Sequence, residues 1–225
     1  PELWARLMAQ GKHPFEPVKF SFGLQATPVK RYEKKHGFER DFMQVWGQVP
    51  KEEQALEEHL REVSGKGAKW YSLHEDWSMI QNYGQPADEA AVRTFVKKVH
   101  EHGMRAIPYF GYEYASAAPD FFENGDACVR KTEEGDYTAV WHRDPHQVDY
   151  IVCYAGGYSR VQLERCIHAM DAYGFDGVYL DGTIIPQACA NAAHGCGYTD
   201  LDGVRHVTYP LRACRSHIKK LSDAV

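Results

Sequence analysis

Gly177-Val178-Tyr179-Leu180-Asp181 is a short apolar run that ends in a carboxylate. Valine and tyrosine favour a strand, and a helical pattern over 159–173, capped by Gly174, comes directly before it. A helix followed at once by an apolar strand is typical of parallel α/β folds, whose active sites lie at the carboxyl ends of the strands. Asp181 is therefore predicted to be a central active-site carboxylate, partly desolvated by the strand before it.

The same alternation of short apolar runs and amphipathic helices extends outward from this strand in both directions. The predicted strands are 18–26, 68–76, 104–113, 149–155 and 177–182, and the predicted helices are 51–64, 88–102, 159–173 and 209–221. An excursion is expected at 129–141, and a long polar loop covers 183–207. Strands and helices that alternate at this spacing predict a parallel sheet covered by helices.

Two parallel architectures fit this pattern, an open doubly wound sheet and a closed (β/α) barrel of the TIM type. The first predicted strand has no glycine-rich phosphate turn after it, which disfavours the nucleotide-binding open sheet. Long loops rich in polar and aromatic residues favour the barrel. A complete barrel has eight strands and about 250 residues, so the five strand–helix units predict a partial barrel. Residues 1–225 are expected to be a single catalytic domain within a longer protein.

The composition indicates which classes of partner the protein could bind. The chain has 225 residues, 44% of them hydrophobic, and a formal net charge of -5. That charge provides no basic field for nucleic acid, and no apolar run reaches the roughly 18 residues of a membrane span. Aromatic residues make up 13% of the chain, which suits carbohydrate binding as well as an ordinary core. The oligomeric state is left open.

The six cysteines are too few for a disulfide scaffold at this length. They contain no CxxC pair, which argues against a structural zinc site, and neither a metal nor a cofactor is predicted. Cys189 and Cys196 flank a short loop and could form a disulfide in an oxidising compartment. Free buried thiols are the more frequent alternative.

Carboxylates gather at the predicted strand ends, where a random distribution would scatter them over helix surfaces. Asp76, Glu113 and Asp181 each end a predicted strand. Glycoside hydrolysis usually needs two carboxyl groups, and Asp181 and Glu113 are the predicted catalytic pair. Gly111 is expected to open space beside Glu113. The alternatives are an N-cap of the following turn or a buried ion-pair partner for Asp181, and a solvated loop acid for Glu113.

Further polar and aromatic residues follow the same strand ends and the loop after Asp181. Those predicted to bind a sugar are His74, Asp76, Trp77, Asn82, Tyr112, Trp141, Tyr154, His194 and Tyr198. Aromatic rings among them offer flat faces on which a sugar could stack, although such rings belong to the core more often. His74 and Asp76 share a strand face, so a structural pair is the alternative for them.

Three segments carry a resemblance to a known family: HEDWSMIQNYGQP, HGMRAIPYFGYE and DGVYLDGTIIPQACANAAHGCGYTDLDG. Together they resemble bacterial barrel proteins related to glycoside hydrolase family 123, over about Leu73 to Pro210. The resemblance implies a barrel and β-N-acetylgalactosaminidase-like action, with an adjacent Asp-Glu pair in a substrate-assisted mechanism. Here Gly182 follows Asp181, and the adjacent acidic pair at a strand end is Glu75-Asp76.

The leading expectation is a glycoside hydrolase that uses strand-end carboxylates as general acid and base on a glycan. One alternative is a barrel that binds carbohydrate without cleaving it. Another is a metal-dependent hydrolase built from His74, Asp76, His194 and Asp181. A polysaccharide substrate favours a periplasmic or secreted location. The sugar, the linkage and the anomer are not predicted.

Overall fold

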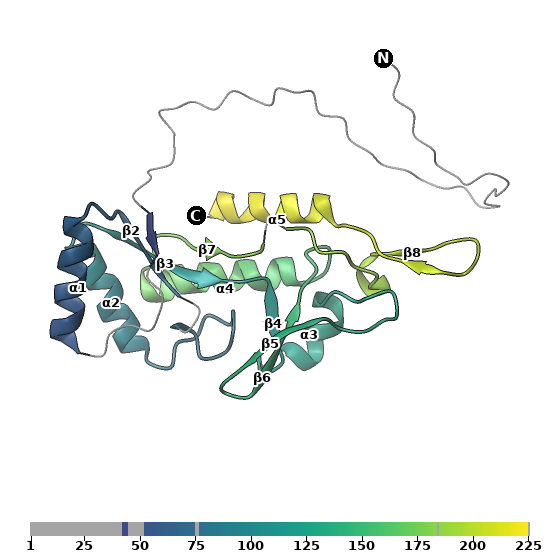
Figure 1. The fold of residues 1–225 in the computed structure, drawn as a ribbon, viewed down its shortest axis with the longest axis horizontal. Coiled ribbons are helices and arrows are strands. Elements are labelled where there is room, and N and C mark those ends of the chain that lie inside the picture. The colour runs from purple at the N-terminus through teal and green to yellow at the C-terminus, as the bar shows by residue number, and fades with distance from the viewer. Residues whose placement is uncertain (1–41, 45–51, 75–76, 184, 225) are drawn as a thin grey trace, which may run out of the picture.

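The computed structural model describes residues 42–44, 52–74, 77–183 and 185–224 (Figure 1). The predicted strand at 18–26 lies outside these residues. The central feature is a four-stranded parallel sheet in the order β1-β2-β3-β7. Its strands are β1 (Phe42–Gln44), β2 (Trp70–Leu73), β3 (Arg105–Phe110) and β7 (Tyr179–Leu180).

Neighbours in this sheet follow one another along the chain, as they do in a (β/α) barrel. Trp70 of β2 pairs with Arg105 of β3, and Tyr109 of β3 pairs with Tyr179 of β7, all in parallel. The predicted strands at 68–76, 104–113 and 177–182 are thus confirmed, although β3 ends at Phe110. The described residues form an open α/β sheet, without the closure of a full barrel.

Four longer helices connect or follow the parallel strands. They are α1 (Glu53–Gly65), α2 (Glu89–Glu101), α4 (Tyr158–Tyr173) and α5 (Leu211–Ala224), each within two or three residues of its predicted bounds. The Asp88 side chain caps α2 by accepting from the Ala91 amide at 2.9 Å. Gly174 ends α4 with a left-handed φ of 80°. Among the described helices, none has the length and apolarity that a membrane crossing requires.

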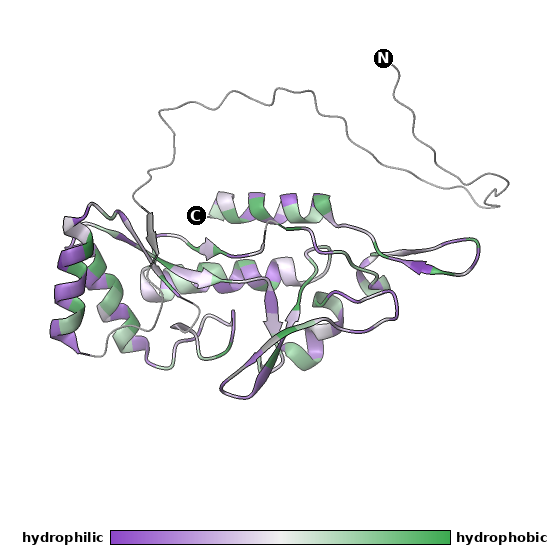
Figure 2. Ribbon diagram, viewed as in Figure 1, coloured by the Kyte–Doolittle hydropathy of each residue, from purple (hydrophilic) through white to green (hydrophobic). Residues whose placement is uncertain are grey.

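The main core lies between the parallel sheet and the helices α1, α2 and α4. Leu60, Phe95, Val99, Ala106 and Phe110 are fully buried there. Figure 2 shows α1 and α2 with hydrophilic and hydrophobic residues in alternation, as helices with one buried face require. Each fully buried large apolar side chain stabilises the fold by about 1.5–3 kcal/mol, so this core fixes β3 and its carboxyl end.

The prediction that 149–155 is a strand of the parallel sheet is wrong. β6 (Gln147–Ile151) lies between β4 (Glu113–Ala115) and β5 (Ala139–Arg143) in a separate antiparallel sheet. The expected excursion at 129–141 runs into β5, which pairs with β6. An apolar run of this length predicts a buried strand but not the direction of its neighbours.

The remaining elements surround this antiparallel sheet. Helix α3 (Phe121–Cys128) follows β4 and was not predicted. The long loop 183–207 contains the 3-10 helix η3 (Ala192–His194) and a hairpin of β8 (Tyr198–Thr199) and β9 (Arg205–His206). Figure 1 shows that this hairpin extends from the end of the molecule opposite α1 and α2.

Candidate functional site

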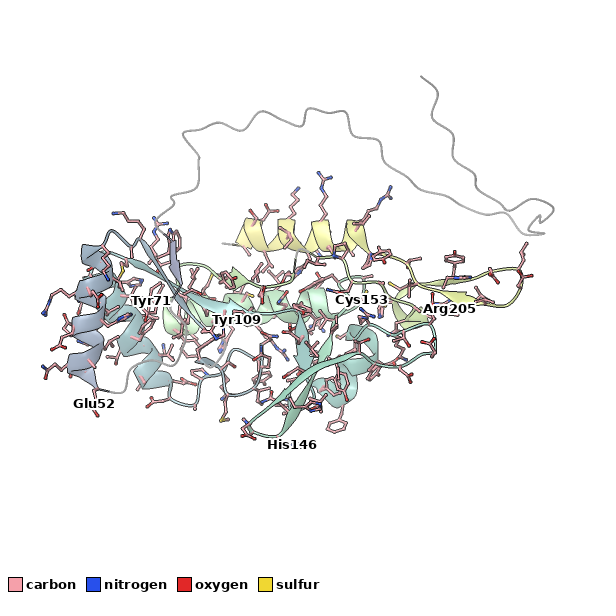
Figure 3. All side chains as sticks on the ribbon, in the orientation of Figure 1. Glu52, Tyr71, Tyr109, His146, Cys153 and Arg205 are labelled. Atoms are coloured by element: carbon pink, nitrogen blue, oxygen red, sulfur yellow. The ribbon has the colours of Figure 1, made fainter. Side chains whose placement is uncertain are left out.

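The parallel strands β2, β3 and β7 end at one edge of the sheet, and a group of polar side chains lies there. The Tyr109 hydroxyl donates a hydrogen bond to Asp181 Oδ2 at 3.0 Å. The Tyr109 ring stacks on Tyr179 with 5.7 Å between centroids, and the His74 ring lies 5.2 Å away on another side. Figure 3 shows Tyr109 on β3, near the end of that strand. The structure thus brings His74 and Asp181 to one edge through Tyr109.

Asp181 is exposed, so the predicted desolvation of its side chain is wrong. Its backbone is nevertheless fixed, because the Asp181 amide donates to the Phe110 carbonyl at 2.9 Å. The Asp181 carbonyl accepts from the Thr183 hydroxyl at 3.2 Å, and Thr183 Oγ1 accepts from the Tyr154 hydroxyl at 3.2 Å. A solvated carboxylate is therefore presented from a rigid strand end.

Glu113 lies on β4, outside the parallel sheet, and is only 2% exposed. The Asn82 side chain donates to Glu113 Oε2 at 2.8 Å and to the Glu113 carbonyl at 3.0 Å. Burial raises the pKa of the Glu113 carboxyl to about 7, the Asn82 bond opposes that rise, and the charges of Asp149 and Asp181 add to it. The alternative of a solvated loop acid is thereby excluded. Near neutral pH this carboxyl is divided between its protonated and ionised forms.

Asn82 is a positioning residue rather than an exposed sugar ligand, since it is 3% exposed. Its backbone has a φ of 54°, a left-handed conformation that asparagine tolerates better than most residues. Asn82 Oδ1 accepts from the Gly111 amide at 2.6 Å. The Asn82 amide group therefore ties the end of β3 to the Glu113 carboxyl.

Gly111 does open space beside Glu113, as predicted, but the Glu113 carboxyl itself occupies that space. A Cβ at Gly111 would lie 2.2 Å from Glu113 Oε2 and 3.3 Å from Asn82 Nδ2. The absence of a side chain at Gly111 thus permits the buried conformation of Glu113.

Gly111→Ala is expected to destabilise the protein by about 1–3 kcal/mol, because the added methyl group overpacks the space that Glu113 fills. Gly65→Ala is the matched control, since a Cβ at Gly65 meets nothing within 4 Å. Urea unfolding of both variants measures the difference. Equal stability of the two variants would show that the Glu113 side chain relocates without cost.

Tyr112 lies within electrostatic reach of both carboxyl groups. Burial raises the pKa of Tyr112 most, and the charges of Glu113 and Asp181 raise it further. The Tyr112 ring packs against Gly182, where a Cβ would lie 2.0 Å from a ring carbon. The left-handed φ of 61° at Gly182 also favours glycine. Packing and backbone conformation therefore both favour glycine at position 182.

A buried polar network behind Glu113 was not predicted from the sequence. Tyr158 donates to the Glu113 carbonyl at 2.6 Å, and Gln162 donates to the Gly111 carbonyl at 2.7 Å. His217 of α5 lies 2.7 Å from Gln162 Oε1, and burial lowers the pKa of His217 to about 4. In the sequence, this network could have been predicted from the polar residues on the inward faces of α4 and α5.

Two predicted sugar platforms belong to the core instead. Trp77 is 4% exposed, donates from Nε1 to the Tyr109 carbonyl at 2.9 Å, and packs edge-on against Phe110. Tyr154 is 5% exposed, and its ring stacks on His217 with 4.4 Å between centroids. A ring enclosed on both sides offers no face to a sugar, so both residues support the site from within.

Two other predicted residues lie at the far end of the molecule. Tyr198 is 54% exposed on the β8–β9 hairpin, where it stacks on His206 with centroids 4.9 Å apart. His194, on η3, lies with Cys153, Cys189 and Cys196. Asp76 and the side chain of Trp141 lie outside the described part of the structure.

The cysteines follow the second of the two sequence-based expectations, that of buried free thiols. All six are free thiols, so Cys189 and Cys196 do not form a disulfide. Among the described residues, one group of side chains could hold a metal ion. It consists of Cys153, Cys189, His194 and Cys196. His194 therefore lies with three cysteines rather than with His74 and Asp181, its partners in the alternative metal-dependent hydrolase, whose remaining ligand Asp76 lies outside the described residues.

Two hollows on the described part of the molecule lie away from Asp181. One hollow is lined by side chains of α1 together with Lys98, and another lies beside Arg165 and Tyr83. Asp181 and Glu113 line neither hollow.

No protein-family model matches the sequence, and neither does any protein of curated function. Among solved structures, an α-galactosidase from Thermus thermophilus is similar over 80% of this chain and 35% of its own, with 16% identity and a TM-score of 0.54. A cycloisomaltooligosaccharide glucanotransferase from Paenibacillus sp. is similar over 80% of this chain and 28% of its own, with 14% identity and a TM-score of 0.56.

A hypothetical protein from Ruminiclostridium thermocellum ATCC 27405 is similar over 81% of this chain and 92% of its own, with 10% identity and a TM-score of 0.50. The chain therefore spans about a third of the length of the galactosidase and nearly all of the hypothetical protein. Likeness at these identities concerns the fold alone.

Proposed function

We propose that this chain forms part of the catalytic domain of a glycoside hydrolase, with Glu113 as general acid and Asp181 as the second carboxylate. The observation that carries the proposal is the contrast between the two groups. Glu113 is buried with a pKa of about 7, and Asp181 is exposed at the end of β7. When two carboxyl groups differ in this way, the one with the raised pKa can act as the acid and the other as the base.

Glu113 is suited to proton donation because a large fraction of its carboxyl groups retain the proton near neutral pH. Its electrostatic coupling to Asp181 means that an ionised Asp181 helps to keep Glu113 protonated. Asn82 and Gly111 hold the Glu113 side chain in place. The activity is expected to fall as the pH rises through about 7, since the acid is then lost.

Asp181 is suited to contact with the sugar because it faces solvent from a fixed strand end. The Tyr109 hydroxyl bond to Oδ2 leaves Oδ1 available as nucleophile, base or stabilising group. Tyr112 and His74 lie near the same edge and are proposed to contact the substrate. Tyr198, exposed on the hairpin, is proposed as a more distant contact.

A panel of chromogenic glycosides tests the proposal, and the resemblance to family 123 puts β-N-acetylgalactosaminide first. α-Galactoside follows, because it is the substrate type named for one structural relative. Hydrolysis of any substrate that is lost in both Asp181→Asn and Glu113→Gln supports the proposal. Hydrolysis that both variants retain in full would refute it.

The near-complete burial of Glu113 favours a second candidate, a barrel that binds carbohydrate without cleaving it. At 2% exposure, the Glu113 carboxyl is covered by its own surroundings. This candidate predicts glycan binding by calorimetry, no turnover of the panel, and unchanged binding in Glu113→Gln.

A further inference from the structure

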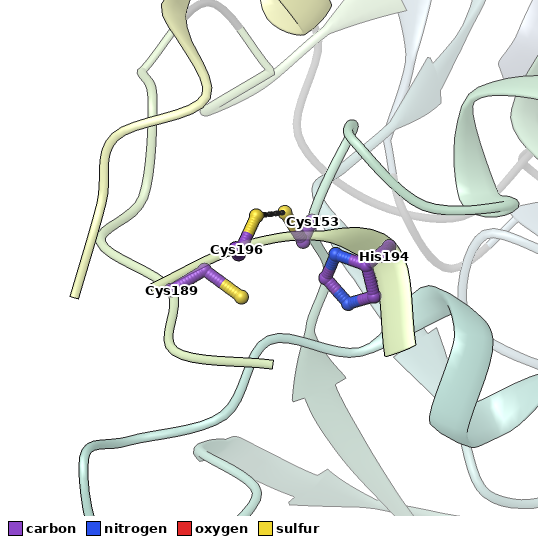
Figure 4. Close-up of side chains that lie close together, drawn as sticks. All are labelled: Cys153, Cys189, His194 and Cys196. Carbon is purple, nitrogen blue, oxygen red and sulfur yellow. Dashed lines mark hydrogen bonds between the residues drawn. The ribbon is translucent and has the colours of Figure 1, made fainter. Parts of the chain in front are cut away.

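Three cysteines and one histidine, distant in the sequence, meet at the hairpin end of the molecule. Cys153 follows β6, while Cys189, His194 and Cys196 belong to the loop after β7. Their four ligand atoms, three sulfurs and one ring nitrogen, all lie within 4.8 Å of one another. Figure 4 shows the sulfurs of Cys153 and Cys196 facing each other, with the side chains of Cys189 and His194 beside this pair and directed toward one another. The cysteine side chains are almost completely buried.

The separation of the sulfurs fits a shared ion better than a disulfide. Cys153 Sγ and Cys196 Sγ are 3.6 Å apart, whereas a disulfide requires about 2.05 Å. Two thiolates bound to one tetrahedral zinc at about 2.3 Å lie roughly 3.8 Å from each other. An ion at the centre of the group would draw the more distant ligand atoms inward by about 1 Å, a movement that side-chain rotation supplies.

The hydrogen bonding of His194 prepares one ring nitrogen as a ligand. His194 Nε2 lies 3.4 Å from the Val129 carbonyl, and a carbonyl can only accept, so Nε2 carries the hydrogen. In the neutral ring Nδ1 then has a free lone pair. Nδ1 is buried without a hydrogen-bond partner. Metal-bound histidines commonly donate from their other nitrogen to a carbonyl in this way.

Surrounding backbone groups support a thiolate at Cys189. The Asn191 amide donates to Cys189 Sγ at 3.3 Å. The Asn191 side chain donates to the carbonyls of Asp126 and Val129 at 2.7 and 2.9 Å, which fixes the loop against α3. The Arg205 guanidinium donates to the Ala190 and Cys196 carbonyls and adds a positive charge beside the group. Figure 3 shows Arg205 and Cys153 at the same end of the molecule.

From this geometry we infer that Cys153, Cys189, Cys196 and His194 Nδ1 form a structural zinc site. Three sulfurs and one imidazole nitrogen match the ligand set of closed structural zinc sites, in which no position is left for substrate. Zinc replaces the thiol protons that the cysteines carry in the free state and releases them to solvent. The site does not depend on the proposed glycosidase activity.

The site fastens the loop after β7 to the antiparallel sheet. Cys153 anchors it at the end of β6, and the neighbouring Tyr154 bonds to Thr183, which in turn bonds to the Asp181 carbonyl. The zinc is therefore a positioning element for the loop that follows Asp181, and its loss is expected to loosen that loop.

Zinc content and cobalt spectroscopy of the full chain test the inference. Protein purified under reducing conditions is expected to hold one zinc per chain by mass spectrometry, with a Kd for added Zn²⁺ of about 10⁻⁷ M or tighter. Co²⁺ in place of zinc is expected to give the intense absorption of tetrahedral cobalt–thiolate complexes. Hydrogen exchange of residues 185–208 is expected to rise when a chelator removes the metal.

Cys189→Ala and His194→Ala are expected to abolish the stoichiometric zinc and the cobalt absorption. Cys214→Ala is the matched control, because Cys214 is also buried but lies outside the group, and it should retain both signals. The inference would be overturned by reduced wild-type protein that binds neither Zn²⁺ nor Co²⁺. A Cys153–Cys196 disulfide in metal-free purified protein would overturn it as well. Because these readouts use wild-type protein, a variant that fails to fold does not weaken the test.

Discussion

At pH 8 the Glu113→Gln variant is expected to be more stable than the wild type by about 3 kcal/mol. The pKa of Glu113 rises from 4.5 in the unfolded chain to about 7 in the fold, chiefly through burial. A tenfold change in proton affinity between the two states corresponds to about 1.4 kcal/mol. Glutamine fills the same space, and its side-chain oxygen can still accept from Asn82. The variant therefore lacks the cost of a buried negative charge.

The pH dependence follows from the direction in which burial moves this pKa. A carboxyl group with a raised folded-state pKa binds its proton more tightly in the folded protein. The contribution of Glu113 to wild-type stability is therefore greatest below about pH 4.5, falls as the pH rises to about 7, and is constant above that. Glutamine does not titrate, so the difference between the two proteins opens over the same interval.

Urea unfolding at pH 4.5 and pH 8 measures the effect for the wild type, Glu113→Gln and the control Glu123→Gln. Glu123 is an exposed residue of α3, so its replacement is expected to change stability little at either pH. Identical stability of wild type and Glu113→Gln at pH 8 would contradict the buried charge. A variant that gains stability and loses hydrolysis would show that Glu113 is kept for activity at a cost in stability.

Asp181→Asn is expected to reduce kcat/KM for the hydrolysed glycoside by roughly 10²–10⁴-fold, the usual contribution of a group that transfers protons or stabilises charge. Asparagine keeps the size of the side chain, and its oxygen can accept the Tyr109 hydroxyl bond. The exposed position means that stability should change by less than about 0.5 kcal/mol. The loss would therefore be chemical rather than structural.

Steady-state kinetics and urea unfolding of Asp181→Asn and Asp223→Asn separate these effects. Asp223 is an exposed aspartate of α5, and its replacement should leave both quantities unchanged. A rise in KM at unchanged kcat would assign Asp181 to substrate binding alone. Wild-type kinetics in Asp181→Asn would remove this carboxylate from the proposed mechanism.

Local sequence patterns were sufficient for most helices and for three strands of the parallel sheet. The cap Gly174 lies where the pattern placed it, and Asp88, the first residue of the predicted helix 88–102, is the N-cap of α2. The apolar run at 149–155 was wrongly assigned to the parallel sheet. Apolar residues are buried in parallel and antiparallel sheets alike, and the direction of pairing here follows from the neighbours β4 and β5. Helix α3 was missed because Gly125 lies within it, and glycine lowers helix propensity.

Apolar periodicity and a preceding capped helix are local signals, so the sequence alone establishes that Asp181 ends a strand of a parallel sheet. The exposure of Asp181 and the burial of Glu113 against Asn82 arise only in the folded chain. Folding likewise brings Cys153 to the cysteines of the later loop, where no CxxC spacing announces the group. The burial of a side chain, its pKa and the geometry of metal ligands depend on contacts between segments far apart in the chain. Such contacts produce no periodic pattern in the sequence.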